Sequence, residues 1–425
     1  MKNMKKRSLR RIFAGILGIG ILLTGAAPCA AAAYGYDEYG DPIVTATPVP
    51  DGQAAAVTPA HSSYYSQAAD TDSIDGWPKG PGIEAQAAVL MDVNTEAVLY
   101  SKNADTQLYP ASITKILTTL LACENLNAKT NITVSEKAST SVTAGDSSIY
   151  AAPGEKFTRD QALMAVMLQS ANEMTLAIAE LTSGSTKKFV EQMNLKARQL
   201  GCTNTHFNNP NGLPDETHYT TASDMAKIAR AAWFNFTFRK FVTTGYYEIP
   251  PTNKFAETRY LLNHHKMMSG QTYAYDGVLG GKTGYTEAAG NTLVTYAKND
   301  NTYLVAVVMQ SVNGAYSDTK ALLDYGFNNF SRSKLTDLRK EISRSCLPAE
   351  KYILKDYKNF TLFRMRRNGY VSLPKGTDVN QLSKSYSMTK NLAGLPLLTI
   401  TYSYNGHEVG TARYYQTRLL SDELL

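Results

Sequence analysis

The chain has 425 residues, of which 43% are hydrophobic and 19% are charged, so it can bury a sizeable core and is long enough for two folded units. The formal net charge is +6. Six positive charges precede the first acidic residue, Asp37, so the rest of the chain is neutral overall and gives no support to nucleic-acid binding. These early charges are Lys2, Lys5, Lys6, Arg7, Arg10 and Arg11.

The N-terminal segment has the order of a secretory signal peptide. The basic start is followed by an apolar run over residues 12–23 and by small residues over 25–33. The apolar run is shorter than the about 20 residues that a membrane-spanning helix needs. We therefore expect residues 1–33 to be a signal peptide that directs export, and a retained N-terminal anchor is the alternative.

The next segment, residues 34–76, mixes Pro, Gly, Ser, Ala, Thr and Tyr without a helical or strand period. We predict that it is a disordered linker. The pattern changes at Trp77-Pro78, where the first folded domain is expected to begin and to extend to residue 345.

The predicted elements of residues 77–345 place strands at both ends and helices in the centre. This order predicts a mixed α/β (α+β) domain whose first and last strands share one sheet. In chain order we expect strands over 87–92 and 97–100 joined by a turn at Asn94-Thr95, helices over 113–123, 159–181, 186–200 and 221–233, strands over 291–297 and 303–310, and a helix over 321–328.

Residues 346–425 are expected to form a small β-rich domain. Strands are predicted over 360–365, 370–373 and 397–404. The pairs Asn368-Gly369 and Asn405-Gly406 are typical of tight hairpin turns.

The first chemical motif is Ser112-Ile113-Thr114-Lys115 at the start of a predicted helix. Residues three apart lie on one helix face, so Lys115 is expected beside Ser112. A hydroxyl is a weak nucleophile until a base takes its proton, and a lysine can do so when burial or a nearby cation lowers its pKa. Alone, the motif is more often an N-capping serine followed by a solvent-exposed lysine.

The second motif is Ser170-Ala171-Asn172, where polar residues interrupt an apolar helical pattern. A serine hydroxyl can relay a proton to a leaving amine, and an asparagine amide can hold a substrate amide with donor and acceptor together. Alone, such a triplet usually marks a helix break or cap.

The third motif is Lys282-Thr283-Gly284, followed by Tyr285, in a glycine-rich strand-like run. Lys and Thr can bind a carboxylate, and glycines allow a substrate backbone to approach closely. A glycine-rich surface hairpin is the alternative when the motif is considered alone.

The three motifs occur together and in this order, which is the signature of penicillin-binding proteins and related β-lactamases. The chain resembles the low-molecular-mass penicillin-binding proteins, the serine-type D-alanyl-D-alanine carboxypeptidases, over about residues 77–330. The resemblance extends to Pro110-Ala111, Met193-Asn194, Leu200-Gly201, Asn211-Gly212-Leu213, His218-Tyr219-Thr220, Ala222, Asp224, Thr286 and Ala288-Ala289-Gly290.

The resemblance implies the role of each motif residue. Ser112 is implied as the acylated nucleophile, Lys115 as its base, and Ser170 and Asn172 as the second wall of the cleft. Lys282 and Thr283 are implied to bind the substrate carboxylate beside Gly284, and the backbone N–H groups of Ser112 and Tyr285 to form the oxyanion hole.

The resemblance further implies peptidoglycan stem peptides as substrates and β-lactam antibiotics as covalent inhibitors. Cys123, Cys202 and Cys346 are not spaced as metal ligands, and neither a metal nor another cofactor is expected. The pattern of residues 418–425 does not predict the amphipathic helix with which many relatives attach to membranes. We therefore do not expect attachment through this segment, and peripheral membrane association stays an alternative to a fully secreted protein.

Two alternative functions remain at this point. A serine β-lactamase would need an efficient water-activating group, and no Glu-x-x-Leu-Asn pattern occurs between the second and third motifs. A non-catalytic peptidoglycan-binding protein would not need the three motifs intact. The histidines His218, His264 and His265 do not make a rival triad, because no Gly-x-Ser-x-Gly sequence accompanies them.

Overall fold

The computed structural model describes residues 35–36, 42–43, 61–312, 314–335, 363–365, 369–390 and 396–416. The expected signal peptide, most of the expected linker, Cys346 and the chain end 418–425 lie outside the described residues. Within the described part, no helix is both long enough and apolar enough to cross a membrane.

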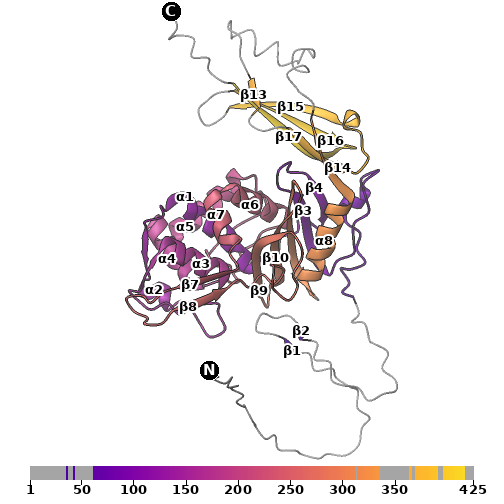
Figure 1. Cartoon of the computed structure of the whole chain (residues 1–425). Coiled ribbons are helices and arrows are strands. Elements are labelled where there is room, and N and C mark those ends of the chain that lie inside the picture. The colour runs from indigo at the N-terminus through magenta and orange to yellow at the C-terminus, as the bar shows by residue number, and fades with distance from the viewer. Residues whose placement is uncertain are drawn as a thin grey trace, which may run out of the picture.

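A five-stranded antiparallel sheet forms the centre of the larger domain (Figure 1). Its strand order is β4-β3-β11-β10-β9, so the first two strands of the domain pair with the last ones, as the sequence predicts. The strands are β3 (Ala85–Asp92), β4 (Val98–Lys102), β9 (Val278–Thr286), β10 (Gly290–Asn299) and β11 (Thr302–Ser311).

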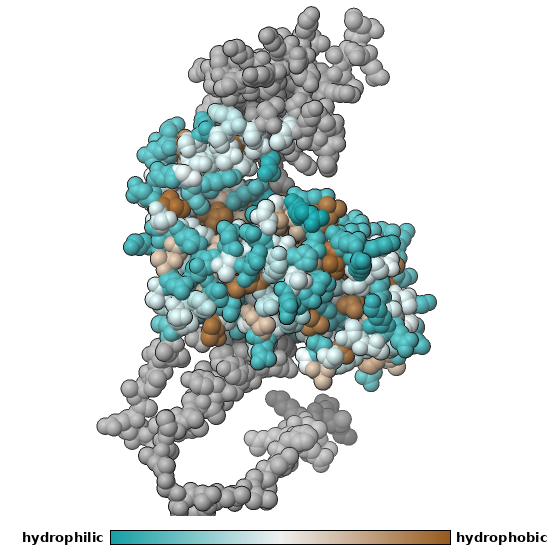
Figure 2. Space-filling view, turned by 180° about the vertical axis from the view of Figure 1, so that it is seen from behind, coloured by the Kyte–Doolittle hydropathy of each residue, from teal (hydrophilic) through white to brown (hydrophobic). Residues whose placement is uncertain are grey.

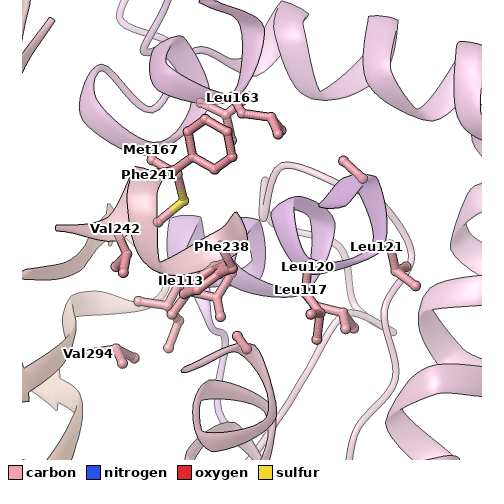
Figure 3. Packing of buried hydrophobic residues seen from close by; sticks show 14 of the residues in the cluster. Ile113, Leu117, Leu120, Leu121, Leu163, Met167, Phe238, Phe241, Val242 and Val294 are labelled. Carbon is pink, nitrogen blue, oxygen red and sulfur yellow. The ribbon is translucent and has the colours of Figure 1, made fainter. Parts of the chain in front are cut away.

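Among the described residues, helices α1 to α7 gather on one side of this sheet and α8 covers the other (Figure 1). The α1 side chains Leu117 and Leu120 are buried in the core between helices and sheet (Figure 3). The helices are α1 (Lys115–Asn125), α2 (Glu136–Ser139), α3 (Arg159–Leu168), α4 (Asn172–Ser183), α5 (Thr186–Gln199), α6 (Ala222–Phe234), α7 (Phe236–Val242) and α8 (Ala315–Asn329).

Two short hairpins flank the helices. One pairs β5 (Asn131–Thr133) with β6 (Lys156–Thr158), and the other pairs β7 (Tyr246–Ile249) with β8 (Arg259–Leu262). The face of the molecule in Figure 2 is mainly hydrophilic with small, separate hydrophobic areas, which is typical of a surface exposed to water.

The single helix expected over 159–181 is wrong, because the structure has two helices, α3 and α4, with a break between them. At the break Ser170 adopts a φ of 58°, which a continuous right-handed helix does not allow. The start of the predicted helix over 113–123 also differs, since a 3-10 turn over Ala111–Thr114 precedes α1. Both departures occur at predicted site residues.

The C-terminal strands form a four-stranded antiparallel sheet in the order β13-β17-β16-β15. The predicted hairpin at Asn405-Gly406 is confirmed. At the other expected hairpin Asn368 lies outside the described residues, but the expected pairing of the two flanking strands is wrong, because β13 pairs with β17 and β14 pairs with β12. The four strands of this sheet are β13 (Phe363–Met365), β15 (Ser383–Lys390), β16 (Pro396–Tyr404) and β17 (His407–Gln416), and the separate two-stranded sheet consists of β12 (Phe330–Lys334) and β14 (Tyr370–Pro374).

The C-terminal strands pack against the β4 side of the large sheet. The His407 ring lies within hydrogen-bond distance of the Val98 carbonyl, 2.6 Å away, and Thr95 and Ser372 pair at 3.0 Å in a buried contact. Trp77 lies between the two units, with its ring centroid 4.8 Å from that of His407 and its indole N–H donating to the Leu99 carbonyl. Apolar and polar contacts together therefore hold the two units against each other.

Part of the expected linker is folded. Residues 70–73 form a 3-10 helix, and the fully buried Lys102 amine donates to the carbonyls of Tyr64 and Ile83. Described residues ahead of the Trp77 boundary that composition indicates are thus packed against the strands of the sheet.

Candidate active site

The three motifs lie on three separate parts of the fold. Ser112 and Lys115 come from the 3-10 turn and first turn of α1, Ser170 and Asn172 from the α3–α4 break, and Lys282, Thr283 and Gly284 from the edge strand β9. The sheet and the packed helices bring these parts together, although they are distant in sequence.

The turn at Ser112 begins with an unusual backbone conformation. Ala111 has a φ of 49°, in the left-handed region that few non-glycine residues adopt. Ala111 and Ile113 are buried, whereas Ser112 between them is partly exposed. The Pro110 carbonyl accepts a hydrogen bond from the Thr292 hydroxyl at 2.9 Å, which attaches this turn to β10. The turn therefore directs the Ser112 hydroxyl out of an otherwise closed core.

Lys115 is fully buried beneath Ser112, with its Nζ atom 2.7 Å from the Ser112 Oγ atom and 2.6 Å from the Asn211 carbonyl. Burial, and next the charge of Lys282, hold the pKa of Lys115 well below its usual range. A neutral amine has two N–H donors and one lone pair, so it can donate to the carbonyl while accepting the serine proton. This arrangement is suited to a general base.

The Asn211 carbonyl belongs to a loop, residues 208–213, that its own side chains hold in shape. The Asn209 amide accepts from the Gly212 N–H at 2.7 Å and donates to the Leu213 carbonyl at 2.9 Å. Gly212 has a φ of +90°, and a Cβ atom there would overlap the Ala111 carbonyl. The glycine thus allows the loop to lie directly against the Ser112 turn.

We expect Gly212→Ala to lower the free energy of unfolding by more than about 2 kcal/mol. The left-handed φ alone costs an alanine about 1–2 kcal/mol, and the overlap with a backbone carbonyl adds to this. Gly184→Ala is the matched control, because Gly184 has a φ of +77° with no neighbouring atom within 4 Å of the added Cβ. Equal losses for the two variants in denaturant unfolding would contradict the close approach.

Strand β9 brings Lys282 and Gly284 beside the Ser112 turn. A Cβ atom on Gly284 would lie 2.8 Å from the Ser112 backbone nitrogen, so only a glycine lets the strand approach the turn this closely. Lys282 is almost completely buried, donates to the Thr283 carbonyl at 2.9 Å, and has its pKa lowered to about 7 by burial. Tyr285 follows on the same edge strand, paired with Asn291, and its side chain is 54% exposed.

Ser170 and Asn172 are buried where α4 packs on α1. The Asn172 N–H donates to the Ser147 carbonyl at 2.9 Å, and the buried Ser170 hydroxyl has no hydrogen-bond partner. Among the described residues, no hydrogen bond joins either side chain to Ser112 or Lys115. A buried hydroxyl without a partner costs free energy.

Three groups contact the motifs; sequence reasoning assigned no role to the first two and expected a structural or cleft-lining role for the third. These are the Asn211 carbonyl, the Thr292 hydroxyl and the buried His218, whose Nε2 atom lies 3.0 Å from the Thr114 hydroxyl. The asparagine-rich, glycine-containing segment 208–212 could have indicated a tight loop. Of the two other histidines that the sequence analysis excluded from a triad, His264 and His265, the His265 Nε2 atom lies 2.8 Å from the Thr295 hydroxyl.

The described residues hold no group of three or more His, Cys, Asp or Glu side chains that could bind a metal ion, and Cys123 and Cys202 are free thiols. The site joins four features: an antiparallel sheet with a helical cluster, a serine on the 3-10 turn before a buried helix, a buried lysine at the start of that helix, and Lys-Thr-Gly on the adjacent edge strand. Together these features define the penicillin-binding class of serine enzymes. Residues 76–313 match the family model described as D-alanyl-D-alanine carboxypeptidase, Peptidase S11. The chain belongs to this family.

Individual relatives agree with this result. The chain is similar to the D-alanyl-D-alanine carboxypeptidase DacF of Bacillus subtilis, with 34% identity over 77% of this chain and 80% of the relative. It is also similar to DacA of Escherichia coli, with 28% identity over 80% of this chain and 84% of the relative. The crystal structure of the Streptomyces K15 DD-transpeptidase aligns with 32% identity and a TM-score of 0.55, covering 59% of this chain and 99% of that chain.

Proposed function

We propose that this protein removes the terminal D-Ala from peptidoglycan stem pentapeptides through an acyl-enzyme on Ser112. The observation that carries the proposal is the buried Lys115 amine 2.7 Å from the Ser112 hydroxyl, beside a second buried lysine on β9. Family membership gives the reaction, and the geometry supports an assignment of roles.

In the proposed acylation, the Ser112 Oγ atom attacks the carbonyl carbon of the penultimate D-Ala while its proton passes to the Lys115 Nζ atom. The N–H groups of Ser112 and Tyr285 would stabilise the oxyanion, since a first-turn N–H has no partner within its own helix. The peptide C–N bond then breaks, and the leaving amine of the terminal D-Ala takes up the proton with the help of Ser170. Water hydrolyses the serine ester and regenerates the hydroxyl.

The remaining motif residues would bind substrate. Lys282 and Thr283 would hold the terminal carboxylate by charge and hydroxyl, and Gly284 would admit the substrate backbone beside β9. Asn172 would hold a substrate amide from the opposite wall. We further propose that the enzyme acts outside the cytoplasm after export and that β-lactams acylate Ser112. We propose residues 77–345, against which part of 61–76 packs, and residues 346–425 as its two domains.

The test combines two measurements on the wild-type protein. Release of free D-Ala from a pentapeptide ending in D-Ala-D-Ala is followed over time, and the penicillin-treated protein is digested with trypsin and mapped by mass spectrometry. We expect D-Ala release and a lasting penicillin adduct on the fragment 103–115, which contains Ser112. Rapid drug turnover without a lasting adduct would favour a β-lactamase. Stem-peptide binding without labelling or D-Ala release would favour a non-catalytic binding protein.

The pH dependence of peptide hydrolysis tests the proposed role of Lys282. Burial lowers the pKa of Lys282 to about 7, so its charge in the free enzyme is lost as the pH rises through about 7. The second-order rate constant for a peptide with a free terminal carboxylate should therefore fall above this pH. For the same peptide with a C-terminal amide, the fall should be absent. An identical alkaline fall for both peptides would contradict the role of Lys282 as carboxylate binder.

A further inference from the structure

The buried His218 has no part in the proposed reaction, yet it contacts the nucleophile turn. Its side chain is 1% exposed, its Nδ1 atom accepts from the Asn208 N–H at 3.1 Å, and its Nε2 atom lies 3.0 Å from the Thr114 hydroxyl. Because a backbone N–H can only donate, Nδ1 is the unprotonated nitrogen. The proton is therefore on Nε2, which donates to Thr114.

This imidazole joins two segments that together determine where the Lys115 amine lies. Thr114 is fully buried and stands directly before Lys115 in the motif. Asn208 begins the loop, residues 208–213, whose Asn211 carbonyl accepts from Lys115 at 2.6 Å. The Thr118 hydroxyl makes a second link to this loop, donating to the Pro210 carbonyl at 2.6 Å.

The backbone beside His218 joins the same two segments. Thr220 exchanges both of its backbone hydrogen bonds with Leu108, which leads into the Ser112 turn. Tyr219 does the same with His206, which leads into the loop over 208–213. The segment over 218–220 therefore lies between the nucleophile turn and the loop, and the imidazole adds side-chain hydrogen bonds to the backbone ones.

We propose that neutral His218 is a positioning residue for Lys115, which holds the loop over 208–213 against the Ser112 turn so that the Asn211 carbonyl fixes the orientation of the amine. With one N–H engaged by that carbonyl, the lone pair of the amine is directed toward the Ser112 hydroxyl. This inference rests on the proposed function, since it assumes that Lys115 is the base.

The surroundings of the ring favour its neutral form. Burial lowers the pKa of His218 to about 4; Asp215 acts to raise it, whereas His206 and Lys115 act to lower it. A charged imidazole would carry a proton on Nδ1 and would lose the hydrogen bond from Asn208. It would also place a cation near an amine that has to remain uncharged.

The test measures acylation by benzylpenicillin as a function of pH in wild-type and variant enzymes. His218→Leu, which fills the space without hydrogen bonds, should acylate about 10²-fold more slowly, a typical result of small misplacement of a reacting group. The acid limb of its pH profile should move to higher pH, because a looser loop exposes Lys115 to water. His218→Gln, whose amide can both donate and accept, should recover most of the rate. The control His206→Gln should behave as wild type.

Thr114→Val removes the same hydrogen bond from the other side with little change in volume, and it tests the proposal even if His218→Leu does not fold. The variant that combines His218→Leu with Thr114→Val should then be no slower than the slower single variant, because both changes remove the same hydrogen bond between the two side chains. A folded His218→Leu enzyme with the wild-type rate and acid limb would overturn the proposal, as would equal losses in the Leu and Gln variants. If wild-type enzyme neither labels nor releases D-Ala, the proposed function itself fails.

Discussion

Replacing Ser112 by alanine is expected to lower kcat for D-Ala release by about 10⁶-fold, the size of loss seen when the nucleophile of a serine protease is deleted. No other described hydroxyl lies within hydrogen-bond distance of the Lys115 amine, so no other serine or threonine can replace it. The penicillin adduct on the fragment 103–115 should disappear at the same time. The D-Ala release assay measures kcat, and mass spectrometry of the penicillin-treated protein measures the adduct.

The matched control for this variant is Ser331→Ala, at an exposed serine on β12. It should release D-Ala and bind penicillin as wild type does. A Ser112→Ala protein that is folded and still forms the adduct would show that another residue is acylated. The assignment of the nucleophile would then be wrong.

Replacing Lys115 by methionine is expected to lower the acylation rate about 10³-fold, within the range attributed to a general base. Methionine keeps the length and apolar volume of the buried side chain but has no amine. Lys115→Arg should not restore activity, since a guanidinium group stays protonated and cannot accept the Ser112 proton. Stopped-flow or quench measurements of penicillin acylation test both variants.

Lys102 provides a matched control for this second prediction. It is fully buried like Lys115, and its amine donates to two backbone carbonyls, but these belong to Tyr64 and Ile83 at the β4 edge of the sheet. Lys102→Met should therefore change stability without changing the acylation rate of the folded protein. If both lysine variants lose activity equally per folded molecule, burial of a lysine and not proximity to Ser112 explains the effect.

Features that depend on neighbouring residues could be predicted from the sequence. The three-residue spacing predicts that Lys115 lies beside Ser112, and the structure has their side chains 2.7 Å apart. The β-branched runs that become β10 and β11 are also local signals, and their pairing with β3 in one sheet is confirmed. The catalytic roles of these residues stay predictions.

The parts that sequence reasoning missed depend on contacts between distant segments. Every residue has a backbone carbonyl, so nothing in the sequence marks that of Asn211 as the acceptor of the Lys115 amine. The apolar helical pattern continues on both sides of Ser170, in α3 and in α4. The sequence pattern therefore predicts one helix where the structure has two. The Asn368-Gly369 hairpin fails for a similar reason, because long-range pairing with β12 determines the partner of β14.

The two edges of the large sheet have different neighbours. Strand β4 carries the contacts to the C-terminal strands, whereas β9, with Lys282, is the opposite edge. Four strand spacings separate these edges, roughly 19 Å at about 4.8 Å per spacing. The contact between His407 and Val98 therefore reaches the sheet at the edge opposite the strand that carries Lys282, and β9 takes no part in it.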